Sequence, residues 1–173
     1  QTYTVMMDDG RKLSYSVDVV AFTGLPIIYL TTSGNGPIES KEDYVEGTVT
    51  IKGGRNFADA PSSVMKIRGR GNSTWFFHPK KAFQMKLDDK STFLDMPSKK
   101  KWLFLAEYSD KTMLRNTISF EMGYLSNLEW TPKSSFAEVY INDEYNGTYN
   151  ITEKVEEGSN RVDIGDEGFL LEI

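Results

Sequence analysis

The sequence predicts an α+β fold in which a mostly antiparallel β-sheet carries one principal helix. Apolar and polar residues alternate along several short runs, such as residues 64–68 and 83–87, and this alternation is typical of strands with one buried face. Apolar residues recur at helical spacing in one long segment, residues 110–126. Aromatic residues make up 13% of the chain, which favours strands for the remainder.

An N-terminal β-hairpin is predicted within residues 1–22, where Asp8-Asp-Gly10 separates two alternating runs. An isolated hairpin is marginally stable in water, so it either docks on the rest of the chain or ends a preceding module. Its pattern resembles the closing hairpin of small immunoglobulin-like modules. We therefore divide the chain into residues 1–24, the hairpin, and residues 25–173, the main domain.

Further strands are predicted in the main domain from similar runs, and the polar stretches between them are predicted as loops. The expected strands are residues 25–32, 45–52, 102–106, 136–141, 148–155, 160–164 and 169–173. Residues 53–63 are expected to form a mobile loop, and the three lysines at 99–101 a solvated turn.

Composition excludes several classes of function. The chain has 173 residues and a net charge of −5, which argues against nonspecific binding of nucleic acid. It has no Cys and a single His, His78, so thiol catalysis, disulfides and metal sites built from Cys or several His are excluded. No apolar run approaches about 18 residues, so no transmembrane segment is predicted. None of these features indicates an oligomeric state.

A basic glycine-rich loop follows the first of the two alternating runs. Its members are Arg68, Gly69, Arg70, Gly71 and Asn72. Glycine lets backbone N–H groups approach a ligand and arginine supplies charge, so the loop suits an anion such as phosphate. Lys81 and Lys86 in the next strand add candidate cations. The alternative is an ordinary β-hairpin, which the same pattern also fits.

Glu121 interrupts the apolar face of the predicted helix. That face carries Leu114, Ile118 and Leu125. We therefore expect Glu121 to point toward the sheet, where an unpaired carboxylate is costly. Its expected partner is Lys81 or Lys86, with Arg68 as a competitor. Glu121 would then either form a structural ion pair or hold a phosphate-binding lysine in place.

The segment Arg68-Gly-Arg-Gly-Asn-Ser-Thr-Trp75 resembles the signature of the spore coat protein H (CotH) kinase family, a group of atypical, secreted-type protein kinases. Further segments resemble the family in the same order along the chain. They are residues 79–87, 101–116, 138–149, 152–154, 160–162 and 168–172. The resemblance extends from residue 25 to the end of the sequence.

The resemblance implies a fold like the N-terminal lobe of a protein kinase. In the complete protein it implies ATP- and Mg²⁺-dependent phosphorylation of Ser or Thr in a protein substrate. It assigns phosphate binding to residues 68–72 and to Lys81 or Lys86, and it makes Glu121 the partner of that lysine. Gln84 and Ala82 stand where family members frequently have Lys and Pro.

Two further residues are secondary candidates for the site, Arg115 and Glu153. A surface pair between Glu153 and Lys154 is the alternative for the second of these. The family's metal-binding and catalytic aspartates lie in segments that would follow Ile173. We therefore expect residues 1–173 alone to hold no catalytic residue and no metal, to retain no nucleotide and to transfer no phosphate.

A noncatalytic surface or spore-coat-like module is the alternative function. The aromatic residues Trp75, Phe76, Phe77 and Trp130 would suit recognition of a carbohydrate or a protein if they were exposed. The family resemblance implies export to a bacterial cell surface or periplasm, although the sequence shows no signal peptide. Convergence of the basic loop, a lysine and Glu121 in one cleft would favour the kinase-like function.

Overall fold

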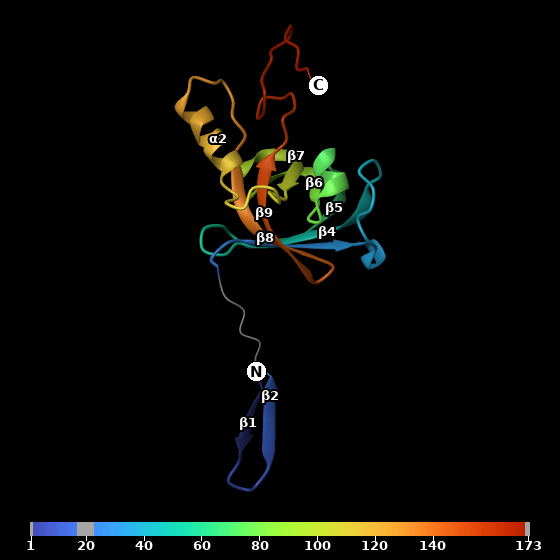
Figure 1. The fold of residues 1–173 in the computed structure, drawn as a ribbon, viewed down its shortest axis with the longest axis vertical. Coiled ribbons are helices and arrows are strands. Elements are labelled where there is room, and N and C mark those ends of the chain that lie inside the picture. Colours follow the sequence, from blue (N-terminus) through green and yellow to red (C-terminus); the bar gives the residue numbers. More distant parts are fainter. Residues whose placement is uncertain (1, 17–22, 172–173) are drawn as a thin grey trace.

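The main body of the protein is a closed barrel of seven strands in the order β3-β4-β5-β6-β7-β9-β8 (Figure 1). A computed structural model describes residues 2–16 and 23–171. The barrel strands are β3 (Ile27–Thr32), β4 (Val45–Lys52), β5 (Ala60–Arg70), β6 (Ala82–Phe93), β7 (Met96–Leu105), β8 (Ser134–Ile141) and β9 (Glu144–Glu153).

The barrel closes where β3 meets β8. These two strands are parallel, with Ile27 opposite Glu138 and Leu30 opposite Ile141, whereas the other neighbouring strands of the barrel are antiparallel. The predicted fold class is therefore wrong: the protein is mostly β and barrel-shaped, and it is not an α+β fold like a kinase N-terminal lobe. Closure leaves the barrel without a free sheet edge.

Alternate residues of every barrel strand fill the core, as their period of two requires. Met65 and Ile67 of β5 and Met85 of β6 are fully buried. Trp102 and Phe104 of β7 are buried beside them and contact the ring of Phe93. The predicted inward faces of residues 64–68 and 83–87 are thus confirmed, and their polar alternates lie on the outside of the barrel.

Several strand boundaries differ from those expected. The strand at residues 45–52 is confirmed as β4. However, β5 begins at Ala60, inside the predicted loop. Leu94 and Asp95, with φ of 48° and 57°, make the tight turn between β6 and β7, so the lysines at 99–101 lie in strand β7 and not in a turn.

Two α-helices accompany the barrel in the part of the chain that the structure describes. The short helix α1 (Ser73–Phe77) follows the glycine-rich loop and was not expected. The principal helix α2 (Arg115–Leu125) begins five residues later than predicted, because Met113 has φ of 57°, a left-handed conformation that an α-helix cannot contain. Asp110 sits in the preceding turn and accepts hydrogen bonds from the backbone N–H groups of Thr112 and Arg115 at 3.1 and 2.9 Å.

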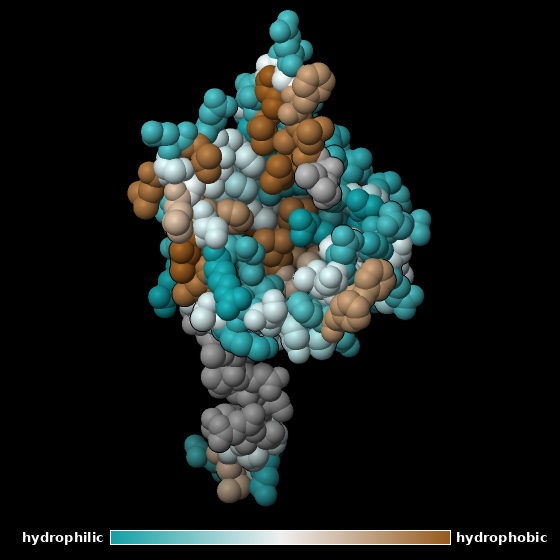
Figure 2. All heavy atoms as spheres, turned by 45° about the horizontal axis from the view of Figure 1, so that its top comes forward, coloured by the Kyte–Doolittle hydropathy of each residue, from teal (hydrophilic) through white to brown (hydrophobic). Residues whose placement is uncertain are grey.

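The apolar face of α2 does not pack on the barrel. Leu114, Ile118 and Leu125 are 47, 54 and 86% exposed, so the predicted burial of this face is wrong. Gly123 is the buried residue of the helix, and a Cβ there would lie 2.6 Å from Oγ1 of Thr131. Figure 2 shows apolar side chains gathered on α2 and along the C-terminal segment.

The remaining predictions concern the N-terminal hairpin and the strands expected near the C-terminus. The expected hairpin is present as strands β1 (Thr2–Met6) and β2 (Lys12–Ser16); its separation as a domain of residues 1–24 stays a prediction. Residues 160–164 and 169–171 form no strand, contrary to expectation, and residues 172–173 lie outside the described part. No helix in the described ranges has the length and apolar character needed to cross a membrane.

Asp110 gives a test of how α2 begins. Hydrogen bonds from the Arg115 N–H and from Thr112 hold the pKa of its carboxyl below the ordinary value. Such a group stabilises the fold above the unfolded-state pKa of about 3.9, and the stabilisation is lost as pH falls through the lowered folded-state pKa. We expect Asp110→Asn to lower the melting temperature at neutral pH, and the difference from wild type to shrink below about pH 3.

Asp89→Asn serves as the matched control, because the side chain of Asp89 is exposed and makes no hydrogen bond or ion pair with another described residue. Thermal melts at both pH values measure the effect. An Asp110→Asn deficit that is the same at neutral and acid pH would contradict the assigned role of the carboxylate.

Candidate functional site: a basic cavity on the barrel wall

A hollow of about 640 Å³ lies against the outer face of β5, β6 and β7. We call it the basic cavity. It is lined by Lys41, Glu42, Arg68, Gly69, Arg70, Gly71, Asn72, Gln84, Leu103, Lys154, Val155, Leu170 and Leu171. All five residues of the predicted phosphate loop are therefore brought together in one cavity.

The floor of the basic cavity is one row of side chains across three strands. Arg68 of β5 is paired with Gln84 of β6, and Gln84 is paired with Leu103 of β7. These residues alternate with core residues of the same strands, so their side chains point away from the barrel interior. The floor thus runs from a cation at β5 to an apolar side chain at β7.

Two glycines give the loop its shape. A Cβ at Gly69 would overlap the ring of Trp75, which lies behind the loop and packs edge-on against Phe83 with ring centroids 6.5 Å apart. Gly71 has φ of +100°, a conformation that favours glycine. The loop can therefore turn sharply into α1 while its backbone stays open to the cavity.

Residues 40–44 support the loop from the other side. The Gly69 N–H donates to the carbonyl oxygen of Ser40 at 2.8 Å, and Lys41 Nζ donates to Oδ1 of Asn72 at 3.0 Å. The Arg68 guanidinium lies 4.9 Å from the ring centre of Tyr44, an arrangement that fixes its plane. These contacts hold the basic side chains in place before any ligand arrives.

The charge of the cavity suits an anion. Its lining has four cations, Lys41, Arg68, Arg70 and Lys154, against one carboxylate, Glu42. The Nε of Arg68 is buried and has no hydrogen-bond partner among the residues that the structure describes. A buried donor without an acceptor is costly, and a phosphate oxygen is an acceptor that guanidinium groups bind well.

The lysines expected to join the loop do not line the cavity. Lys81 Nζ donates to the carbonyl oxygen of Trp75 at 2.5 Å, behind the loop, and Lys86 is exposed on the outer face of β6. The neighbouring Lys80 donates to the carbonyl oxygen of Thr148, and burial lowers its pKa. The cavity takes its lysines from other segments instead, Lys41 and Lys154.

The expected ion pair of Glu121 is also wrong. Glu121 is exposed and forms no ion pair with Lys81, Lys86 or Arg68, all of which the structure describes. It lines a different hollow of about 320 Å³, beside the turn between β6 and β7. The kinase-like role assigned to this carboxylate therefore has no geometric support.

Neither secondary candidate lines the cavity. The Arg115 side chain is 80% exposed at the start of α2, with Nε 3.8 Å from Oδ1 of Asp110. Glu153 does not pair with Lys154 at the surface. Its carboxylate is buried and lies 2.5 Å from Nη1 of Arg161, at the end of β9 and directly before the cavity residues Lys154 and Val155.

Sequence reasoning missed the two outer walls of the cavity. Lys41 and Glu42 carried no recognisable signal, because a polar turn distant in sequence gives no indication of its spatial neighbours. Lys154 did carry one, since it lies in residues 152–154, which resemble the CotH family. Leu170 and Leu171 were expected in a strand, not in a cavity wall.

A known protein family matches the part of the chain that carries the glycine-rich loop. The family model described as CotH kinase protein matches residues 67–171, which is more than half of the chain and includes most of the cavity lining. The protein therefore belongs to the CotH kinase protein family, and the resemblance found in the sequence is confirmed. A search of the curated proteins gave no match.

The packing of Trp75 on Gly69 predicts the effect of an added methyl group. Gly69→Ala places a Cβ within the Trp75 ring and must displace the ring or the loop, at a cost of about 1–3 kcal/mol. Thermal unfolding and tryptophan fluorescence measure both effects. Gly36→Ala is the control, because Gly36 has φ of −67° and its Cβ would lie 3.6 Å from its nearest neighbour. Equal stability of the two variants would contradict the packing.

Proposed function

We propose that the basic cavity binds a nucleotide, with its phosphates at the glycine-rich loop, and that the protein is the nucleotide-facing part of a CotH-like kinase. In the complete protein the nucleotide is ATP, used with Mg²⁺ to phosphorylate Ser or Thr of a protein. The observation that carries the proposal is the division of the cavity into a basic side and an apolar side.

The two sides fit the two halves of a nucleotide. Arg68, Arg70 and Lys41 gather on the β5 side, whereas Leu103, Val155 and the leucines at 170–171 form the opposite wall. Neighbouring strands are about 4.8 Å apart, so the row from Arg68 to Leu103 spans roughly 10 Å. An inorganic anion would use the basic side alone, while a nucleotide uses both, with its base against the apolar wall.

Phosphoryl transfer needs positioning and charge neutralisation more than covalent chemistry from the protein. In this chain, Arg68 and Arg70 would bind phosphate oxygens, and the backbone of Gly69–Gly71 can approach them closely. Mg²⁺ supplies further neutralisation when bound. Within the described ranges no group of three or more His, Cys, Asp or Glu side chains could hold a metal. By the family resemblance, we propose that aspartates of the family's metal-binding segments provide the metal ligands in the complete protein.

Nucleotide binding by this chain tests the proposal. Without metal ligands we expect a weak affinity for ATP, with a Kd of about 1 mM, and NMR shift changes centred on residues 68–72 and 154–155. Replacing Arg68 or Arg70 by Met removes a charged hydrogen-bond donor, which is worth about 1.5–3 kcal/mol. Each variant should weaken ATP binding at least tenfold.

Lys90→Met is the matched control, because Lys90 is an exposed cation of β6 outside the cavity lining. It should leave the Kd within about twofold of wild type. Shift changes that map outside the cavity, or an ATP affinity that survives loss of both arginines, would refute the proposed function.

A further inference from the structure

We infer that Arg161 is a positioning residue that holds the apolar wall of the basic cavity in place, through its buried ion pair with Glu153. This inference rests on the proposed nucleotide function, because it concerns the wall that would receive the base. Arg161 itself does not line the cavity.

The ion pair is buried at the end of the barrel. The side chains of Arg161 and Glu153 are 0 and 1% exposed, with Nη1 and Oε1 2.5 Å apart. The guanidinium lies 5.1 Å from the ring centre of the buried Trp102, which is paired with Glu153 across β7 and β9. The other carboxylate oxygen of Glu153 accepts the backbone N–H of Lys133 at 2.9 Å. Arg161 is thus locked into the barrel by charge and by packing.

Arg161 belongs to a compact loop, residues 156–162, that is held together by backbone hydrogen bonds. Its backbone N–H donates to the carbonyl oxygen of Gly158 at 2.8 Å, and the N–H of Val162 donates to the carbonyl oxygen of Glu156 at 3.2 Å. Glu157 and Val162 form a short bridge. These contacts join residues 156–162 into one hydrogen-bonded unit, and the Arg161 side chain fixes that unit to the barrel.

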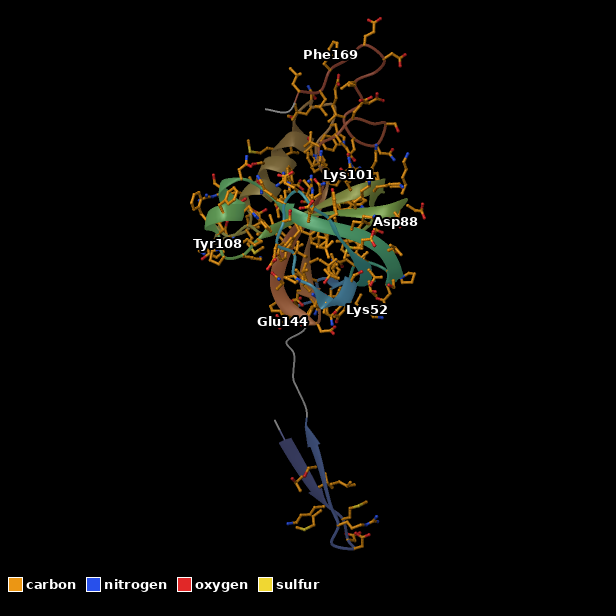
Figure 3. All side chains as sticks on the ribbon, turned by 90° about the vertical axis from the view of Figure 1, so that its right-hand side faces the viewer. Lys52, Asp88, Lys101, Tyr108, Glu144 and Phe169 are labelled. Atoms are coloured by element: carbon orange, nitrogen blue, oxygen red, sulfur yellow. The ribbon has the colours of Figure 1, made fainter. Side chains whose placement is uncertain are left out.

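More exposed contacts tie the same loop to β7. Lys101 Nζ lies 3.0 Å from Oε2 of Glu156, and Asn160 Nδ2 donates to the carbonyl oxygen of Ser98 at 3.4 Å. Figure 3 shows Lys101 at the end of the barrel from which the C-terminal segment rises toward Phe169. The Lys101–Glu156 pair is partly exposed, whereas the Arg161–Glu153 pair is fully buried. Because solvent weakens an ion pair, we take the buried pair as the principal anchor.

Residues of the cavity wall come both before and after this anchored loop in the sequence. Lys154 and Val155 follow Glu153 directly in the chain, and Leu170 and Leu171 come after the loop. The basic side of the cavity has separate supports in residues 40–44. Loss of the anchor should therefore disturb the wall for the base, together with the neighbouring Lys154, and spare Lys41, Arg68 and Arg70 on the side of the phosphates.

Two probes separate these effects: ATP, which needs both sides of the cavity, and inorganic tripolyphosphate, which needs the basic side. Arg161→Met alone leaves the Glu153 carboxylate buried without a partner, which can unfold the protein. The test therefore also uses the double variant Glu153→Gln with Arg161→Met, which removes both charges and keeps similar side-chain volumes.

For a folded double variant, checked by circular dichroism, we expect the Kd for ATP to rise about tenfold and the Kd for tripolyphosphate to change less than about twofold. Hydrogen exchange at residues 154–162 should accelerate while the amides of β5 and β6 keep their protection. Lys101→Met, which removes the partly exposed ion pair with Glu156 of the same loop, should leave both Kd values near wild type.

The outcomes distinguish the two proposals. Wild-type protein that binds neither probe, or binds outside the cavity, overturns the nucleotide function itself. Wild-type protein that binds both probes, together with a double variant that loses both equally or loses neither, overturns the positioning role of Arg161 alone.

Discussion

The parallel pairing of β3 with β8 is the constraint on which the rest of the structure depends. It joins residues 27–30 to residues 138–141 and turns an otherwise open antiparallel sheet into a closed barrel. Closure buries the alternate apolar side chains of all seven strands in one core, so the opposite face of β5, β6 and β7 becomes a rigid floor. A floor of this kind can hold Arg68, Gln84 and Leu103 in a fixed row without support from a helix.

The alternation of apolar and polar residues in the sequence correctly predicted which strand side chains face the core. The alternation of Met65 and Ile67 with Lys66 and Arg68 identified the inward face of β5 correctly, because side-chain direction in a strand follows from its period of two. Barrel closure could not be predicted from this alternation, because it depends on the pairing of β3 with β8, two strands more than 100 residues apart in the sequence. The start of α2 was missed because Met113 adopts a left-handed conformation, and Glu121 was misplaced because the helix packs through Gly123 and not through its apolar stripe.

The sequence predicted one side of the candidate site, the glycine-rich loop, but not the opposite wall of the cavity. Residues 68–72 were identified because glycine lets the backbone approach a ligand and arginine supplies charge. The structure explains each glycine by a specific contact or backbone angle. Most of the opposite wall comes from the chain after β9, next to the buried ion pair of Arg161 with Glu153. A buried ion pair leaves no periodic signal in the sequence, which is why Lys154 and not Arg161 was considered as a partner of Glu153.

In the proposed binding mode, the basic cavity receives a nucleotide in one defined orientation. Photolabelling with an ATP analogue that carries an azide on its base, followed by mass spectrometry of the peptides, measures that orientation directly. We predict labelling of the peptides that contain Val155 or the leucines at 170–171, and its suppression by excess ATP. Labelling of the peptide that contains residues 68–77, or labelling that ATP does not suppress, would contradict the account.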